Sequence, residues 1–450
     1  MESALLLAFA FGIGILLVLI LVLRLNAFIA LLISSISVGL LAGMPIQIII
    51  DTIIAGMGGT LGYVAIIIGL GAIFGGILEH TGATQILSRF LLDKFGPEKA
   101  QIALALSGFL IAIPVFFDVA FIILIPVLYA LQKQTGKSLL YYAIPLLASL
   151  AVTHAFIPPT PGPIAVADII GADLGWIILF GFVVGLPTTL IAGIVYGSFI
   201  SKKIFITIPE TLVPTALPDT DTQRPPVGLV LSLILFPLLL IVMNTVTKAV
   251  YGDLENTWLA ILRFVGHPII ALILSTLMAT YLLGTRYGAT REQLQEVSMK
   301  ALQPAGIIIL ITGAGGVFKQ MLVETGAGKM LAEQFIAFDI MPLLAAFSVA
   351  LILRLLQGSA TVAMITAAGI MQPILSALNL PDTQLALIVL SIAAGASGFS
   401  HLNDSGFWLV SRYLGMNELD TLKSWTVMTG ILALIALFIL LILWNLVLIY

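Results

Sequence analysis

Residues able to bind an anion or carry a proton lie in two short motifs that interrupt otherwise apolar sequence. The first spans Thr153 to Pro163 and has four prolines and a glycine among its last six residues. A helix cannot continue through such a run, so backbone groups, the hydroxyl of Thr160 and the small Gly162 become available to a substrate. His154 precedes the break and could shuttle protons near neutral pH. The alternative is a simple extramembrane loop, although apolar sequence resumes at Ile164.

The second motif spans Ser397 to Trp408, where glycines and small polar residues replace the prolines. Asn403 and Ser405 could bind the hydroxyls of a substrate, and His401 is a second candidate for proton transfer. Asp404 is the leading candidate for proton coupling, because an ionisable residue in the middle of a membrane is costly and is functional by default. The alternative is that Asp404 caps a helix or faces water at the end of a span.

Two further polar positions lie in long apolar stretches. Ser359 and Thr361 offer hydroxyls and the N–H groups of a helix start, donors that can hold a carboxylate without a full counter-charge. The alternative for both is a hydrogen bond to their own helix backbone. Arg354 could attract an anion or simply pair with an acid. Asp118 could take a proton, pair with a cation or sit in a structural hydrogen bond.

These motifs must be positioned by membrane helices. Of the 450 residues, 60% are hydrophobic and 9% are charged, and the mean hydropathy is +1.18. Because lipid cannot satisfy backbone polar groups, the long apolar runs predict an all-α polytopic membrane protein rather than a barrel, whose strands would alternate. There is no cysteine, the net charge is −3, and neither a basic arm nor a phosphate-binding loop occurs. We therefore expect no cofactor, no metal and no nucleic acid partner.

The chain also contains an internal repeat. A polar, proline-rich stretch, 201–226, separates two hydrophobic halves, 1–200 and 227–450. Segment 29–35 resembles segment 270–276, and Thr-Gly-Ala recurs after 244 positions. At that spacing Thr160, Gly162, Val166 and Gly171 fall on Asp404, Gly406, Val410 and Gly415. This order predicts a duplication, which in transporters often gives two inverted repeats.

Each half has one apolar stretch too long for one span and too short for two. These stretches, about 100–131 and 340–378, predict re-entrant hairpins whose tips end inside the membrane. Each is followed by a predicted broken membrane helix, at about 139–172 and 384–416. If the N-terminus is outside, 14 of the 19 Lys and Arg residues lie in cytoplasmic segments; the exceptions are Lys248, Arg263, Lys319, Lys329 and Arg354. The positive-inside rule therefore favours periplasmic termini and inverted halves.

Three segments together resemble the gluconate permease (GntP) family of the ion transporter superfamily: 154–163, 357–363 and 401–408. The similarity runs the full length of the chain. The resemblance implies proton-coupled symport of D-gluconate or a close sugar acid across the bacterial inner membrane. It also implies a scaffold, a mobile unit moving like an elevator, and a homodimer. Related superfamily members carry a Ser-Asn-Thr type signature at both hairpin tips. Here Ser359-Ala-Thr361 keeps only the hydroxyls, which makes a proton more plausible than sodium as the coupling ion.

Two other function classes remain open. A membrane-embedded hydrolase would need a nucleophile with a positioned base, and Ser405 and His401 are separated by a Gly- and Asn-rich break that does not hold them on one helical face. The other class is an ion channel or a cation/proton antiporter, and the inverted repeats fit an antiporter, or a cation-coupled transporter of another small organic anion, as well. Neither the preferred sugar acid nor the proton stoichiometry can be deduced from the sequence.

Overall fold

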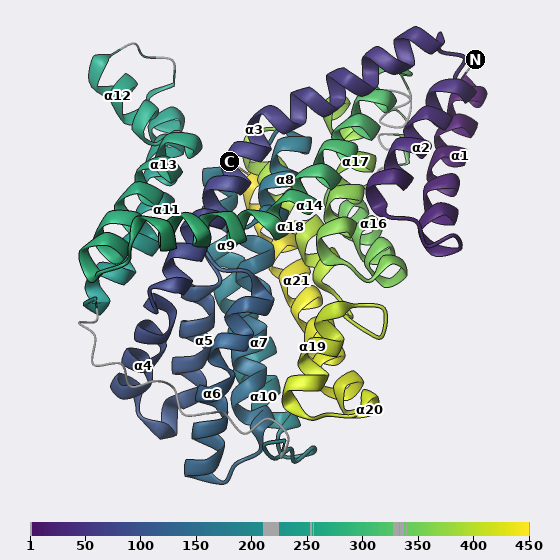
Figure 1. Cartoon of the computed structure of the whole chain (residues 1–450). Helices are drawn as coiled ribbons and strands as arrows, with labels where there is room; N and C mark the ends of the chain where they lie inside the picture. The colour runs from purple at the N-terminus through teal and green to yellow at the C-terminus, as the bar shows by residue number, and fades with distance from the viewer. Residues whose placement is uncertain are drawn as a thin grey trace.

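The computed structural model describes residues 2–209, 225–252, 254, 256–326, 333, 337, 338 and 340–449. Most of the predicted linker, 210–224, lies outside the described residues. The described residues form helices and loops without any β-strand (Figure 1), which confirms the predicted all-α fold class. Nine helical stretches within this described part are long and apolar enough to cross a membrane.

The two halves contain similar elements in the same order. The first half contains α1 (Glu2–Leu21), α2 (Ala27–Leu41), α3 (Ile46–His80), α4 (Ala83–Phe95), α5 (Ala100–Ile111), α6 (Phe117–Thr135), α7 (Leu139–Phe156), α8 (Pro161–Ile170), α9 (Leu174–Thr189) and α10 (Tyr196–Ile200). The second contains α11 (Val227–Tyr251), α12 (Thr257–Val265), α13 (Pro268–Ala279), α14 (Arg291–Glu324), α16 (Pro342–Gln357), α17 (Ala360–Leu378), α18 (Asp382–Ser397), α19 (Ser405–Leu414), α20 (Glu418–Thr421) and α21 (Val427–Ile449). Helices α8 and α19 start at Pro161 and Ser405, 244 positions apart.

The long helices α3 and α14 pack closely because glycines lie where they meet. A Cβ atom on Gly56 of α3 would lie 2.8 Å from the Cα atom of Val317. A Cβ atom on Gly316 of α14 would lie 2.1 Å from Oγ1 of Thr60. Neither position can hold a larger residue without moving the helices, which explains the glycine here by packing.

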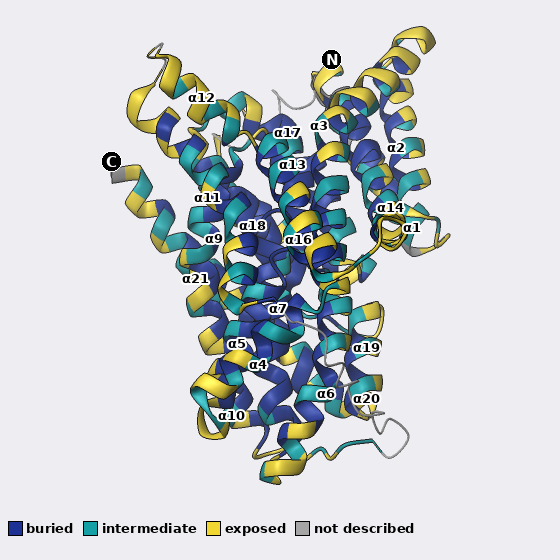
Figure 2. Cartoon of the chain, turned by 60° about the vertical axis from the view of Figure 1, so that its left-hand side comes forward, coloured by how far each residue is buried: buried dark blue, intermediate teal, exposed yellow. Residues whose placement is uncertain are grey.

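Helix α8, from the first predicted broken helix, packs against both of these long helices, and α17, from the second predicted hairpin, packs against α14. Helices α5 and α6 are joined through 112–116, and α16 and α17 through Gly358 and Ser359. In the stretch from Leu139 to Ile170, 83% of an apolar 18-residue segment is buried in the protein. In the stretch from Glu418 to Leu448 the corresponding share is 28%. Figure 2 shows α7 and α18 as the buried centre of the molecule, whereas α12 and the end of α21 are largely exposed. The break after α7 is therefore buried, whereas the break after α18 is exposed at Leu402 and Asn403.

Candidate functional site

Eight of the eleven residues predicted to act in transport line one cavity of about 260 Å³ between the hairpins and the broken helices. We call it the central cavity. The eight are Asp118, His154, Gly162, Arg354, Ser359, Thr361, Asp404 and Ser405. They come from both halves of the chain, so the fold brings together residues that are up to 287 positions apart, from Asp118 to Ser405.

Four helices begin at the wall of this cavity. The first turns of α6, α8, α17 and α19 contribute Asp118, Gly162, Thr361 and Gly406, respectively. The first N–H groups of a helix have no partner inside the helix and carry a partial positive charge. Several such ends around one cavity favour an anion, which suits a carboxylate.

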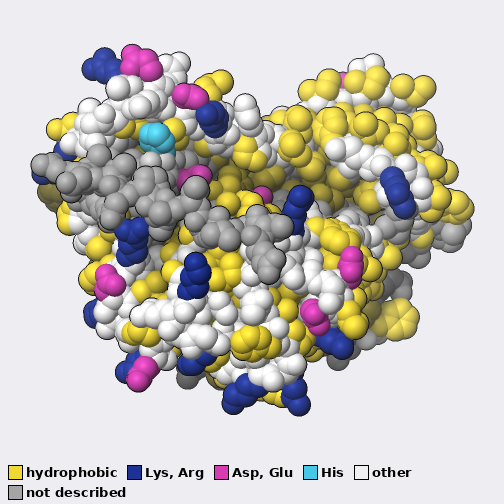
Figure 3. Space-filling model, turned by 60° about the horizontal axis from the view of Figure 1, so that its bottom comes forward, with side chains coloured by type: hydrophobic (Ala, Val, Ile, Leu, Met, Phe, Trp, Pro, Cys, Tyr) yellow, Lys and Arg dark blue, Asp and Glu magenta, His cyan; other side chains and the backbone are white. Residues whose placement is uncertain are grey.

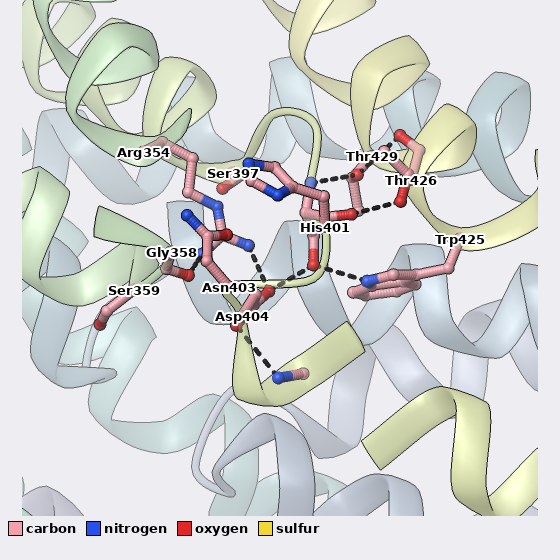
Figure 4. A network of polar contacts seen from close by, with 12 residues as sticks. Arg354, Gly358, Ser359, Ser397, His401, Asn403, Asp404, Trp425, Thr426 and Thr429 are labelled. Atoms are coloured by element: carbon pink, nitrogen blue, oxygen red, sulfur yellow. Dashed lines mark hydrogen bonds and ion pairs between the residues drawn. The ribbon is translucent and has the colours of Figure 1, made fainter. Parts of the chain in front are cut away.

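The strongest polar contacts in the cavity wall join the second hairpin to the second break (Figure 4). The guanidinium of Arg354, near the end of α16, forms an ion pair with the carboxylate of Asp404 and donates to the backbone carbonyl of Gly358. Asp404 also accepts hydrogen bonds from the hydroxyl of Ser400 and from the backbone N–H of Gly406, the latter at 3.0 Å. Arg354 is only 4% exposed, so the ion pair is largely shielded from water. The sequence left two roles open for Arg354: the structure shows the pairing with an acid, and the attraction of an anion stays a prediction.

Asp118 has a different environment from Asp404. It lies in the first turn of α6, is exposed to the cavity, and forms no ion pair with any described residue. His154 of α7 lines the same cavity, and its Nδ1 atom is buried without a hydrogen-bond partner among the described residues. The ring of Phe116, just before α6, lies 6.1 Å from the His154 ring. Within the described part of the chain, one side of the cavity thus holds a carboxylate without an ion pair and an imidazole with an unpartnered Nδ1 atom.

Three predicted site residues lie outside the central cavity. Thr160 is buried and donates from its hydroxyl to the carbonyl of Ile157 at 2.7 Å. Asn403 and His401 both contact the carbonyl of Leu355, at 3.0 and 3.1 Å, so they satisfy carbonyls at the C-terminal end of α16. Such groups would otherwise lack a partner. All three residues therefore bind backbone carbonyls at helix ends and do not face the central cavity.

Sequence reasoning missed several residues of the site. Ser400 lay inside the second motif but was given no role, and it is 1% exposed beside Asp404. Trp425 and Phe117 form an aromatic part of the cavity wall, with ring centroids 5.6 Å apart. Trp425 lies in the π-helical segment Leu422–Thr426 between α20 and α21, and no pattern in the sequence marks that irregularity. Among the described residues, no group of three His, Asp or Glu side chains could hold a metal ion.

Comparison with known proteins decides the family. The sequence profile of the GntP family permeases matches residues 4–447. The chain belongs to the GntP permease family. It is 40% identical over 411 residues to the low-affinity gluconate transporter of Escherichia coli, with 91% of each chain covered. It is 38% identical to the gluconate permease of Pseudomonas aeruginosa, with 92% of each covered. It is 35% identical to the Gnt-II system L-idonate transporter of Escherichia coli, and the match covers 92% of this chain and 93% of that transporter.

The fold is also similar to a solved structure. The crystal structure of the Alcanivorax borkumensis YdaH transporter matches 88% of this chain and 87% of its own, with a TM-score of 0.63 at 13% identity. Membership of the GntP permease family makes this protein a transporter and not an enzyme. Together with the nine apolar stretches among the described helices, it also makes the protein a multi-pass membrane protein.

Proposed function

We propose that this GntP permease carries D-gluconate or a closely related sugar acid across the membrane together with protons. The observation that carries the proposal is the central cavity, where four helix N-termini and Arg354 surround one small space. Its volume of about 260 Å³ is close to the lower end of the range for ligand pockets, about 300 Å³, which favours a short acyclic acid over a larger substrate. The names of the relatives, gluconate and L-idonate transporters, support the same substrate class.

The substrate carboxylate would bind at the N-terminal ends of α8, α17 and α19, near Arg354. Ser359, Thr361 and Ser405 offer hydroxyls at the same wall, and Gly162 leaves room for the ligand. Hydroxyls, and a guanidinium whose charge is already balanced by Asp404, suit a transported acid, because the acid must be released as easily as it is bound. Asn403 and Thr160 would stabilise the helix ends beside the cavity without touching the substrate.

Asp118 is the group that we assign to the proton, with His154 beside the same cavity. Both lack a structural partner within the described part of the chain, so a change in their protonation would break no contact of the fold. Asp404, the leading candidate from the sequence, already accepts from Arg354, Ser400 and Gly406. Protonating Asp404 would remove the counter-charge of a buried arginine, which is costly. His401 contacts a helix carbonyl and is a weaker candidate than His154.

We further propose that transport uses an elevator-like movement of the hairpins and broken helices against a scaffold that includes α3 and α14. Glycines at the boundary support this proposal. A Cβ atom on Gly75 of α3 would lie 2.0 Å from the carbonyl oxygen of Pro114, at the tip of the first hairpin. A Cβ atom on Gly71 would lie 3.1 Å from the carbonyl oxygen of Pro159, in the first break. Because these positions carry no side chains, no side chain of α3 there would block a movement of the first hairpin and the first break along α3.

The halves would be inverted, with both hairpin tips inside the bacterial inner membrane and both termini periplasmic. Figure 3 views the face at which α4 and α6 end, with Lys94 and Lys133 in their last turns, and Lys and Arg side chains are spread over this face. A basic face is expected on the cytoplasmic side. A homodimer in the bilayer completes the proposal.

The test is uptake of labelled D-gluconate into proteoliposomes under an inward proton gradient, with and without a proton ionophore and in sodium-free buffer. Proton symport predicts ionophore-sensitive, sodium-independent accumulation. Accumulation that requires sodium, or transport of another organic anion in place of D-gluconate, would favour the cation-coupled alternative. A proton-driven sodium flux without any organic substrate would favour an antiporter.

A further inference from the structure

A chain of hydrogen bonds connects the ion pair of the central cavity to a helix that sequence reasoning gave no role. Nε1 of Trp425 donates to the hydroxyl oxygen of Ser400 at 2.6 Å, and that hydroxyl donates to Oδ2 of Asp404 (Figure 4). The same carboxylate oxygen accepts from Arg354. The guanidinium at the end of α16 is thus held, through two intermediates, by the indole of a helix more than 70 positions later.

Ser400 is fixed on every polar atom that it has. Its backbone N–H donates to the hydroxyl of Thr429 at 3.0 Å, and its carbonyl accepts from the hydroxyl of Thr426. Its side chain both accepts from Trp425 and donates to Asp404. Ser400 and Trp425 are 1% and 3% exposed, so water does not compete for these bonds. The π-helical turn that contains Trp425 is the kind of irregularity that often occurs at functional sites.

Arg354 keeps donor capacity that the fold does not use. A guanidinium has five N–H donors, and each of its two terminal nitrogens forms one hydrogen bond here, to Gly358 and to Asp404. Its Nε atom is buried without a hydrogen-bond partner among the described residues. A long side chain that is already held in one rotamer loses less entropy when an anion binds.

We propose that Trp425 and Ser400 are positioning residues for the anion: through Asp404, they hold the Arg354 guanidinium in the orientation that receives the substrate carboxylate. The inference rests on the proposed function, because it assumes that the central cavity binds a sugar acid. It deepens that function by assigning part of the affinity to residues that need not touch the substrate carboxylate.

The competing explanation is that Trp425 only packs, since its ring also contacts Phe117. Trp425→Phe separates the two, because it keeps an aromatic ring beside Phe117 and removes the N–H donor. Ser400→Ala removes one hydroxyl and so interrupts the same chain from its other side. Trp444→Phe is the matched control, a 6% exposed indole further along α21. Ser391→Ala is the second, because the buried Ser391 hydroxyl donates to the carbonyl of Leu343 at 2.7 Å, away from the cavity.

The experiment measures the KM and the maximal rate of D-gluconate uptake in proteoliposomes. It compares these four variants, the double variant Trp425→Phe with Ser400→Ala, and the unsubstituted protein. We expect KM to rise roughly three- to tenfold in Trp425→Phe and Ser400→Ala, the range for one lost hydrogen bond, with the maximal rate nearly unchanged. The controls should keep the original KM. The double variant should be little worse than either single one, because both interrupt one chain.

Unchanged KM in Ser400→Ala, or independent effects that add in the double variant, would overturn this inference. So would a loss confined to the maximal rate, which indicates a structural role. If Trp425→Phe does not fold, Ser400→Ala decides alone, because it deletes a single hydroxyl. A failure of the proposed function looks different, since the unsubstituted protein would then show no saturable D-gluconate uptake at all.

Discussion

Each of the two breaks in the polypeptide ends in an extended residue that precedes a ten-residue helix, but the side chains of these residues differ. Thr160 precedes α8 and Asp404 precedes α19, at equivalent positions 244 residues apart. The Thr160 hydroxyl donates to the carbonyl of Ile157, three residues earlier, whereas Asp404 forms a buried ion pair with Arg354. At the hairpins the difference is reversed, because α6 presents Asp118 in its first turn where α17 presents Thr361.

This difference separates two tasks within one cavity. Helix N-termini from both halves lie at the cavity wall, and such ends favour an anion. The second half adds a charge-compensated pair that can orient a carboxylate. The first half adds the Asp118 carboxylate, which forms no ion pair with any described residue. In this account anion binding belongs mainly to the second half and proton coupling to the first.

The largest expected effect comes from breaking the ion pair of the second half. Arg354→Ala leaves Asp404 buried without its counter-charge, which should cost about 3–5 kcal/mol of stability, whereas Arg354→Ala with Asp404→Ala should recover most of it. Neither variant should bind D-gluconate as tightly as the original protein. Thermal unfolding in detergent, followed by ligand titration, measures both. Equal destabilisation in the single and double variants would contradict a compensated pair.

The second effect concerns glycines from the two halves. Gly358 has φ of +81°, and a Cβ atom there would lie 2.2 Å from the carbonyl oxygen of Asn403. Gly358→Ala should therefore destabilise the second hairpin tip by about 1–3 kcal/mol or more. Gly162→Ala meets only the sulfur of Met364, at 3.0 Å, and that flexible side chain can move. Melting temperatures of the two variants provide the comparison, and a larger loss at Gly162 would contradict it.

A smaller effect distinguishes the two threonines. Thr361→Val removes a hydroxyl that lines the cavity and should raise the KM for D-gluconate roughly three- to tenfold. Thr160→Val removes the bond to Ile157, so it should lower stability by about 1 kcal/mol and leave KM unchanged. Uptake kinetics and unfolding of both variants check this. If KM changed in Thr160→Val and not in Thr361→Val, the result would indicate that the substrate binds at the first break.

The smallest effect is expected at an exposed ion pair on α14. Lys300 contacts Glu296 at 2.7 Å, with both side chains more than half exposed. Surface pairs of this kind contribute little, because water and salt screen them. Glu296→Gln should leave both melting temperature and uptake unchanged. A loss comparable to that of Arg354→Ala would show that burial is not what distinguishes the two pairs.

Local sequence signals predicted much of the fold. Prolines and glycines marked both breaks, and the apolar stretches of intermediate length marked the pairs α5–α6 and α16–α17. The contents of the site were harder to predict, because they depend on which side of a turn each residue faces. Within one motif Asp404 and Ser405 face the cavity, while His401 and Asn403 face the end of α16. Trp425 could not be found, because only the folded chain brings it to Ser400.

The most direct test of this division compares Asp118→Asn with Asp404→Asn in one proteoliposome assay. Uptake driven by a proton gradient and exchange of D-gluconate without a gradient are measured for each. We predict that Asp118→Asn keeps exchange and loses proton-driven accumulation with its pH dependence. We also predict that Asp404→Asn keeps the pH dependence and shows a raised KM in both modes. If Asp118→Asn still accumulated D-gluconate under the gradient while Asp404→Asn lost only coupling, the assignment of the two tasks would be wrong.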